Sequence, residues 1–181
     1  PAFVAEHLKR LQAAGIQPHF MLGDLGQLET VERLIRRGVY TGPLILNHVM
    51  IGGGADGPNP YNMMEFIRRV PPGAVLTIEA IMRTVLPLNT MAIAMGLHVR
   101  CGIEDNLWGR KGERLTNVQQ VEQLVRISRE LYREVATGEQ AREIYQIGTR
   151  YRDADETLAQ LGYLPNRASG ERGIPLLRRV A

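Results

Sequence analysis

Four short apolar segments alternate with amphipathic segments along the chain, and this alternation limits the folds that the chain can adopt. The apolar segments cover residues 17–22, 44–51, 74–81 and 98–102. Each has the length and the apolar or β-branched content of a buried strand, whereas the stretches between them carry apolar residues at helical spacing. Regular alternation of this kind is typical of an α/β fold with parallel strands joined by helices. We therefore predict four parallel strands, with the helices packed on one face of the sheet.

Helical periodicity and turn signals predict the helices. A glycine just past a helical repeat often ends a helix, and Asn, Thr or Pro often begins one. By these rules, helices are expected at residues 3–14, from 28 up to Gly38, from Pro60 up to residue 71, at 87–95, from the cap Asn117 as far as Val135, from the capping box at Thr137, and at 153–161.

The composition excludes several classes of protein. Of the 181 residues, 44% are hydrophobic and 23% are charged, which is ordinary for a soluble globular protein. The net charge of +3 arises from 22 basic and 19 acidic residues, a balance that argues against a nucleic-acid partner. No apolar run is long enough to cross a membrane. The single Cys101 excludes an internal disulfide and fits a reducing compartment, so we expect a cytoplasmic protein.

The most informative stretch covers residues 98–106 (HVRCGIEDN). It begins as a strand, Gly102 lets the backbone turn, and two adjacent carboxylates follow. Adjacent carboxylates repel each other unless a cation stabilises them. If the chain turns back at Gly102, Arg100 can pair with Asp105, which leaves Glu104 free to face a metal ion. Charged residues at the carboxyl end of a strand are typical of active sites in βα folds; a surface turn with a structural Arg–Asp pair is the alternative.

Several motifs together resemble one enzyme family. The residues that carry the resemblance are HVRCGIEDNL at 98–107, KG at 111–112, TN at 116–117 and EVATGEQAREI at 134–144. They resemble the last barrel strand, and a segment that follows it, in the β-keto acid cleavage enzymes. A weaker similarity covers most of residues 15–145 in register.

The resemblance implies a function and a set of site residues. Members of this family are zinc-dependent (β/α)8 barrels that condense a β-keto acid with acetyl-CoA, giving acetoacetate and a new CoA thioester. The resemblance implies that Glu104 is a zinc ligand and that Arg100 and Asp105 form the catalytic dyad. It therefore implies zinc as the cofactor, and a β-keto acid and acetyl-CoA as the small-molecule partners.

The chain is too short for a whole barrel of this type. A closed (β/α)8 barrel needs eight strands and about 250 residues, whereas four strands are expected here. The resemblance implies that residues 1–145 are the C-terminal half of the barrel and that residues 146–181 extend beyond it. The N-terminal residues carry no signal-peptide pattern and look like the inside of a helix, so we expect the chain to start in mid-domain. We expect residues 164–181 to be extended over a surface or a neighbouring subunit.

A glycine-rich loop follows the second predicted strand. Residues 52–57 (GGGADG) match the pattern of a dinucleotide-binding turn, and Glu79 lies near the position of a ribose-binding acid. The proline-containing stretch that follows does not open a helix tightly, as a dinucleotide turn would. We therefore favour a flexible barrel loop whose backbone N–H groups contact the CoA substrate, with Gly52 and Gly53 as substrate-binding residues.

Other polar residues are candidates on weaker grounds. By the resemblance, Arg83 faces the active site and binds substrate; the alternatives are a solvated side chain or a pair with Glu79. His48 and His98 lie within strands, where a histidine is usually a packed residue. The family's two zinc-binding histidines form an H-x-H pair, which this sequence lacks. Because a catalytic zinc needs about three protein ligands and only Glu104 can be assigned, the site of this chain alone is expected to be incomplete.

Two further expectations concern substrate and assembly. Family members that cleave 3-keto-5-aminohexanoate carry acidic residues in the strand that corresponds to residues 18–24 (PHFMLGD), so a neutral or apolar β-keto acid is expected here. The principal hypothesis is a zinc-dependent β-keto acid cleavage transferase that forms a homo-oligomer or is completed by a missing N-terminal half. The alternative is a non-catalytic fragment or truncated paralogue that lacks the metal-binding histidines.

Overall fold

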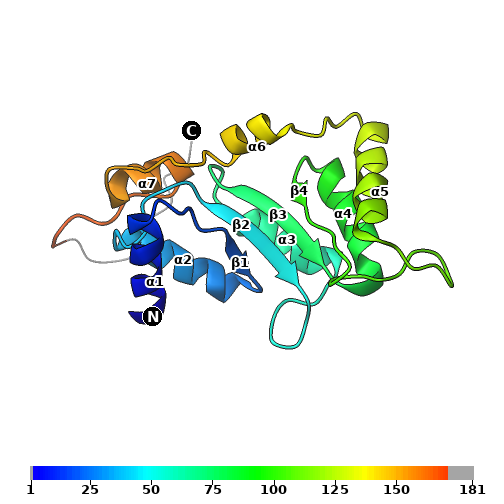
Figure 1. The fold of residues 1–181 in the computed structure, drawn as a ribbon. Coiled ribbons are helices and arrows are strands. Elements are labelled where there is room, and N and C mark those ends of the chain that lie inside the picture. Colours follow the sequence, from blue (N-terminus) through cyan, green and yellow to red (C-terminus); the bar gives the residue numbers. More distant parts are fainter. Residues whose placement is uncertain (1, 171–181) are drawn as a thin grey trace, which may run out of the picture.

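The structure, a computed structural model, describes residues 2–170 and contains one parallel sheet (Figure 1). The four strands lie side by side in the order in which they occur along the chain. All three neighbouring pairs are parallel, as predicted. The strands are β1 (Phe20–Leu22), β2 (Ile45–Met50), β3 (Val75–Ala80) and β4 (His98–Val99). This arrangement is compatible with part of a (β/α)8 barrel.

All four strands are shorter than the apolar segments that predicted them, and β1 and β4 are shortened most. β1 begins at Phe20 rather than at residue 17, and the side chain of Gln17 donates to the backbone O of Tyr145 and accepts from the backbone N–H of Gly148. β4 ends at Val99, although the backbone N–H of Arg100 still donates to the carbonyl of Ile78 on β3. The chain then leaves the sheet through the turn at residues 102–106.

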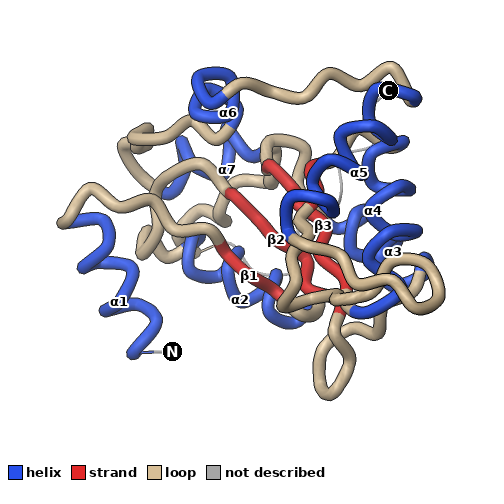
Figure 2. Tube along the Cα trace, turned by 45° about the vertical axis from the view of Figure 1, so that its right-hand side comes forward, coloured by secondary structure: helices blue, strands red, loops and turns tan. Residues whose placement is uncertain are grey.

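Helices connect the strands and surround part of the sheet (Figure 2). Predicted and observed helices agree in number and approximate position for the described residues. The elements are α1 (Ala2–Ala13), α2 (Leu25–Arg36), α3 (Pro60–Arg69), the 3-10 turn η1 (Met82–Thr84), α4 (Val85–Ala94), α5 (Asn117–Glu130), α6 (Gly138–Ile144) and α7 (Ala154–Leu161). None of the helices in this part of the chain is long and apolar enough to span a membrane.

The two faces of the sheet differ in character because side chains alternate along each strand. On one face, Leu46 and Ile78 join the buried residues of α2, α3 and α4, such as Phe66, in the hydrophobic core. These three helices pack on the same face, as predicted. The other face carries the polar residues Asn47 and Glu79, which are nevertheless only 2% and 3% exposed. Polar groups buried to this degree need partners, and the partners define the candidate site described below.

The start and end of α5 differ from the prediction. Thr116, not Asn117, is the N-cap, because Thr116 and Gln119 form a reciprocal capping box. The side chain of Asn117 instead accepts a hydrogen bond from the backbone N–H of Ile103 at 2.9 Å. The helix ends at Glu130 rather than continuing toward Val135.

α7 is part of the hydrophobic core although it lies close to the C-terminus. Leu158 and Leu161 are fully buried in the cluster formed by the sheet and its helices. The predicted stop at Gly162 is confirmed, since this residue is the left-handed C-cap of the helix. Of the predicted extension at residues 164–181, the described part contacts α2 at Arg36, whose side chain donates to the carbonyl of Leu164 and whose own carbonyl accepts from the side chain of Asn166. Residues 171–181 lie outside the described residues.

We predict that Gly73→Ala destabilises the protein by separating α7 from the loop between α3 and β3. A Cβ atom on Gly73 would lie 2.3 Å from the backbone O of Gln160 and 2.8 Å from Cα of Leu161, so the backbone must shift. Overpacking of this kind costs about 1–3 kcal/mol, which thermal unfolding would detect as a lower Tm. Gly138→Ala is the matched control, because its Cβ meets open space. Equal Tm values for the two variants would contradict the docking of α7.

Candidate active site

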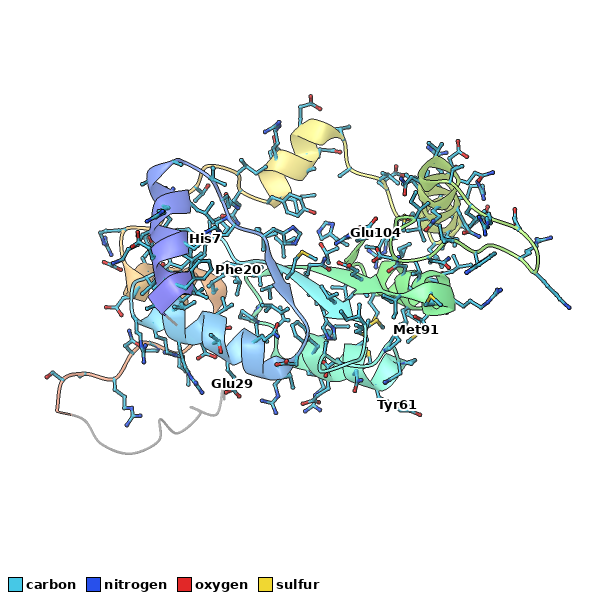
Figure 3. The ribbon with its side chains drawn as sticks, turned by 60° about the horizontal axis from the view of Figure 1, so that its bottom comes forward. His7, Phe20, Glu29, Tyr61, Met91 and Glu104 are labelled. Atoms are coloured by element: carbon cyan, nitrogen blue, oxygen red, sulfur yellow. The ribbon has the colours of Figure 1, made fainter. Side chains whose placement is uncertain are left out.

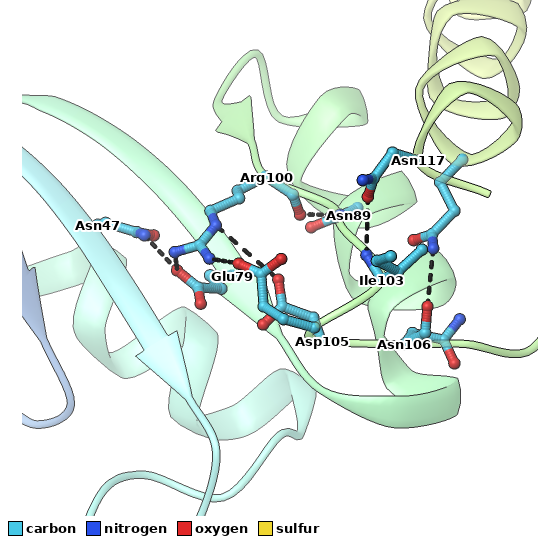
Figure 4. Close-up of polar contacts among 10 residues, drawn as sticks. Asn47, Glu79, Asn89, Arg100, Ile103, Asp105, Asn106 and Asn117 are labelled. Carbon is cyan, nitrogen blue, oxygen red and sulfur yellow. Dashed lines mark hydrogen bonds and ion pairs between the residues drawn. The ribbon is translucent and has the colours of Figure 1, made fainter. Parts of the chain in front are cut away.

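Arg100 is the centre of a polar cluster on the sheet face opposite α2, α3 and α4 (Figure 4). Its Nη1 atom lies 2.8 Å from Oε2 of Glu79. Its Nη2 atom donates to Oε1 of Glu104, and its Nε atom lies 3.9 Å from Oδ2 of Asp105. One guanidinium therefore contacts three carboxylates, which come from the end of β3 and from the turn after β4.

The arrangement corrects one detail of the sequence prediction. Arg100 and Asp105 form an ion pair, but their 3.9 Å separation is too long for a hydrogen bond. The N–H groups of Arg100 bond to Glu79 and Glu104 instead. The sequence suggested that Glu104 would not contact the Arg100 guanidinium. In the structure it does, although its side chain remains 64% exposed. Figure 3 shows Glu104 across the sheet from Tyr61, which lies on α3.

Glu79 is a site residue that sequence reasoning did not assign. It lies on β3 and is buried, so its charge must be compensated. Besides Arg100, it is contacted by the side-chain N–H of Asn47 from β2. The only signal in the sequence was a single acid inside the apolar stretch of residues 74–81. Glu79 pairs with Arg100 and Arg83 donates to the carbonyl of Gly109, so the alternative pairing of Arg83 with Glu79 is not found.

The turn after β4 is built to hold the carboxylates in place. The backbone N–H groups of Asp105 and Asn106 both donate to the carbonyl of Gly102, at 3.1 and 3.0 Å. A Cβ atom on Gly102 would lie 2.7 Å from Oε2 of Glu104, so a larger residue there would displace that carboxylate. The carbonyl of Asp105 accepts a 2.7 Å hydrogen bond from the backbone N–H of Met82. The connection after β4 is thereby joined to the connection after β3.

Burial and a neighbouring negative charge raise the pKa of Asp105 to about 6. Its side chain is largely withdrawn from water, which disfavours the charged form, and the carboxylate of Glu79 acts in the same direction. Arg100 opposes both effects but does not cancel them. A carboxyl group with a pKa near neutrality can both accept and donate a proton under ordinary conditions, as general acid–base catalysis requires.

The described residues do not supply a complete zinc site. No group of three His, Cys, Asp or Glu side chains between residues 2 and 170 is arranged to hold a metal ion. His48 stacks on Phe66 with ring centroids 3.8 Å apart, and its Nε2 atom lies 3.0 Å from Oδ2 of Asp56. The ring of His98 lies against Tyr145. Glu104 is the one accessible carboxylate of the Arg100 cluster, so this donor set alone does not fit a catalytic zinc.

The other predicted site residues lie apart from the Arg100 cluster. Gly52 and Gly53 have φ angles of 71° and 63° and belong to a loop closed by the hydrogen bond from the Gly52 N–H to the carbonyl of Asp56. That loop is bonded to the end of β1 through Gly23. Arg83, in η1, donates to the carbonyl of Gly109 at 3.4 Å and lines a separate cleft. The structure thus brings together Arg100, Glu104 and Asp105, but not these three residues.

Comparison with known proteins identifies relatives of the chain. A 3-keto-5-aminohexanoate cleavage enzyme from Acetoanaerobium sticklandii is 34% identical over 134 residues, which cover 74% of this chain and 49% of that enzyme. The same-named enzyme from Fusobacterium nucleatum is 30% identical and is matched over 77% of this chain and 51% of its own length. A 3-dehydrocarnitine:acetyl-CoA trimethylamine transferase from Rhizobium meliloti is 28% identical, with 83% and 50% covered.

The chain therefore spans about half the length of the curated relatives it matches. The family model described as beta-keto acid cleavage enzyme matches residues 1–147, which is most of the chain. The matched region contains all four parallel strands and the whole Arg100 cluster. On this evidence, the chain belongs to the β-keto acid cleavage enzyme family.

Proposed function

We propose that this chain is the C-terminal half of a metal-dependent enzyme that condenses a β-keto acid with acetyl-CoA to give acetoacetate and a new CoA thioester. Residues 1–145 would form the half-barrel and residues 146–181 an extension. The observation that carries the proposal is the Arg100 cluster at the carboxyl ends of β3 and β4, where βα barrels place their active sites. The names of the relatives, which include cleavage enzymes and an acetyl-CoA transferase, support the same reaction class.

In this proposal Asp105 transfers protons and Arg100 positions it. Loss of a proton from the carbon between the two carbonyl groups turns a β-keto acid into an enolate nucleophile, and the enolate released by carbon–carbon bond cleavage takes up a proton, so the reaction needs a group that accepts a proton and returns it. Asp105 is buried and its pKa of about 6 suits that task. Arg100 is fixed on its other side by the buried Glu79, so its charge stays next to the reacting carboxyl group. Glu79 and Asn47 are then positioning residues rather than catalytic ones.

The charge of the cluster favours a bound cation. Glu79, Glu104 and Asp105 together carry up to three negative charges, and Arg100 supplies one positive charge. A divalent metal ion at the exposed carboxylate of Glu104 would relieve this excess. We propose zinc, with Glu104 as the single ligand from the described residues and the remaining ligands from another segment. A bound zinc would supply Lewis-acid polarisation of a substrate carbonyl.

The face of β1 beside this cluster is apolar, which bears on the substrate. Met21 pairs in register with Asn47, so it shares the face that carries the cluster, and its side chain is 55% exposed. An ammonium group on the substrate would find no carboxylate on this strand. We therefore propose a neutral or apolar β-keto acid as the substrate.

A non-catalytic fragment or truncated paralogue is the second candidate. The observation that favours it is the absence of a three-ligand metal group within residues 2–170. Two measurements distinguish this candidate from the first proposal. A non-catalytic protein would not bind zinc and would not turn over acetyl-CoA, even when any missing segment is present.

We predict that Glu104→Gln and Asp105→Asn in the full-length protein separate metal binding from proton transfer. Glu104→Gln should lose most of the bound metal, because a neutral amide is a poorer ligand than a carboxylate. Asp105→Asn should retain the metal and lose turnover by about 100-fold or more, the range of a general acid–base group. Metal analysis beside a CoA-thioester assay measures both effects.

The control for this pair is Glu65→Gln, on the exposed surface of α3, which removes the same charge far from the cluster. It should change neither the metal content nor the rate. Full metal content and full activity in Glu104→Gln would mean that the carboxylates after β4 are only part of a structural turn.

We predict that Glu79→Gln lowers kcat about 10- to 100-fold, as is typical when a residue that orients a site group is changed. The amide keeps the shape of Glu79 but not the charge that fixes Arg100. The control is Glu32→Gln, which breaks a surface pair with Arg36 in which both side chains are about one-third exposed. Steady-state kinetics should show wild-type kcat for the control alone. A wild-type kcat in Glu79→Gln would show that Arg100 needs no buried partner.

We predict that the 181-residue chain is not a stable monomer. Among residues 2–170, β1 and β4 each pair with one neighbouring strand only, which leaves both edges of the sheet open, and Met21 and Ile51 are about half exposed. Open strand edges and exposed apolar side chains favour association. Light scattering of the isolated chain should give a mass above 20.3 kDa or aggregation. A monodisperse monomer would contradict both the homo-oligomer and the completing half-barrel.

A further inference from the structure

A cleft of about 630 Å3 lies beside the Arg100 cluster and is not used by the chemistry proposed above. Its walls are η1, the start of α4, the connection between β4 and α5, and α5 itself. In Figure 1 that connection projects away from the sheet before it enters α5. The volume is within the range of about 300–1,000 Å3 that is usual for small-molecule sites. The question is which ligand its lining fits.

The cleft is lined by three arginines without a carboxylate partner. Arg83 comes from η1, Arg110 from the connection after β4 and Arg126 from α5, and none of them forms an ion pair with a described residue. Of the two acids in the lining, Glu113 has its carboxylate occupied by the backbone N–H of Arg110 at 2.9 Å. The other is the exposed Glu122. Three arginines against two glutamates leave the lining with a net charge of +1, and the three guanidinium groups are not held in ion pairs with described residues, which suits phosphate groups.

A second cleft in the molecule shows the contrast. It lies along α2 and is also lined by arginines, but Arg33 pairs with Glu29 and Arg36 pairs with Glu32 across one helical turn. Those arginines are neutralised by the helix that carries them. The three arginines of the first cleft, in contrast, come from three separate elements and are brought together by the tertiary fold.

The lining also contains groups that suit the rest of a nucleotide. Trp108 is partly buried, and both polar atoms of the Asn106 side chain bond to its backbone, at 2.7 and 3.1 Å, so the residue is held in place. The Arg114 guanidinium lies over the indole, 5.2 Å from the ring centroid, so a base would stack on the other face of the ring. The buried Gln120 donates to the carbonyl of Asn106 at 2.7 Å, while its Oε1 atom has no hydrogen-bond partner.

The position of the cleft connects it to the Arg100 cluster. Asn106, in its lining, directly follows Asp105. Arg83 directly follows Met82, whose backbone N–H donates to the carbonyl of Asp105. In barrels of this type, the connections after the last two strands frequently form a phosphate site. A long ligand with phosphates in the cleft could therefore place its other end near Asp105.

We propose that this cleft binds the phosphorylated adenosine end of the CoA substrate, with Arg83 and Arg110 on the phosphates and Trp108 beside the adenine. The proposal rests on the proposed function, in which an acyl group is exchanged with CoA. CoA combines the required features: anionic phosphates, an aromatic base, and a flexible pantetheine arm that ends in the reacting thiol. The cleft then anchors the substrate, and the Arg100 cluster acts on its far end.

The test is calorimetric binding to the full-length protein, with CoA, ATP and pantetheine as separate probes. Pantetheine carries the reactive arm without phosphates, and ATP carries phosphates and adenine without the arm. The double variant Arg83→Gln/Arg110→Gln should bind CoA roughly ten- to hundredfold more weakly, the usual effect of lost hydrogen bonds to charged groups. Its affinity for pantetheine should not change. The control Arg142→Gln removes an exposed arginine of α6, and CoA affinity should stay at the wild-type value.

Each result decides the question. The proposal is supported if the double variant binds CoA more weakly and has a correspondingly higher KM for acetyl-CoA, while the Arg142→Gln control behaves as the wild type. Wild-type CoA affinity in the double variant overturns it. ATP shares the phosphates and the adenine, so it should also bind the double variant more weakly; an equal ATP affinity in the wild type and the double variant would overturn the proposal as well. If the arginine-dependent CoA binding is found in a protein with no cleavage activity, the cleft assignment stands and the proposed function fails. If the enzyme is active and KM for acetyl-CoA is unchanged in the double variant, only the cleft assignment fails.

Discussion

The candidate site depends on the buried ion pair between Glu79 and Arg100. Glu79 lies in the middle of the sheet, where an uncompensated charge would cost several kcal/mol. Arg100, directly after β4, compensates that charge at 2.8 Å, and Asn47 from β2 contacts the same carboxylate. Three neighbouring strands are thereby joined by side chains as well as by their backbones. Because the buried end of the pair is fixed, the guanidinium has a defined position relative to Glu104 and Asp105.

The cluster around this pair has more negative than positive charge, because three carboxylates surround one guanidinium. Arg100 supplies one positive charge, and besides Glu79 it faces the two carboxylates that follow β4. Asp105 responds through a raised pKa, because it is buried and faces Glu79. Glu104 is largely exposed, so it can recruit a cation from solution or from another segment. The two carboxylates differ in burial, and the proposed division of proton transfer and metal binding between them rests on this difference.

The sequence predicted the local structure better than the contacts between distant residues. Apolar runs and glycine stops located the strands and most helix ends, since these are set by neighbours within a few positions; Gly162 is one such stop. The turn at Gly102 was predicted for the same reason. The partner of Arg100 was not, because Glu79 is 21 residues away and nothing in the local pattern shows which acid will lie on the adjacent strand. The cap of α5 was misplaced by one residue, since Thr116 and Asn117 both have side chains that can cap a helix.

A backbone hydrogen bond joins the connections that follow β3 and β4, and this joint fixes the Arg100 cluster relative to the arginine-lined cleft. Met82 has a φ angle of 55°, a conformation that a residue with a side chain adopts at a cost of about 1–3 kcal/mol. Its N–H donates to the carbonyl of Asp105, so the two connections are fixed to each other at this point. Asp105 belongs to the Arg100 cluster on one side of the joint, whereas Arg83 lines the arginine cleft on the other. A ligand bound in that cleft would therefore be held at a constant distance from Asp105, the group proposed to transfer protons.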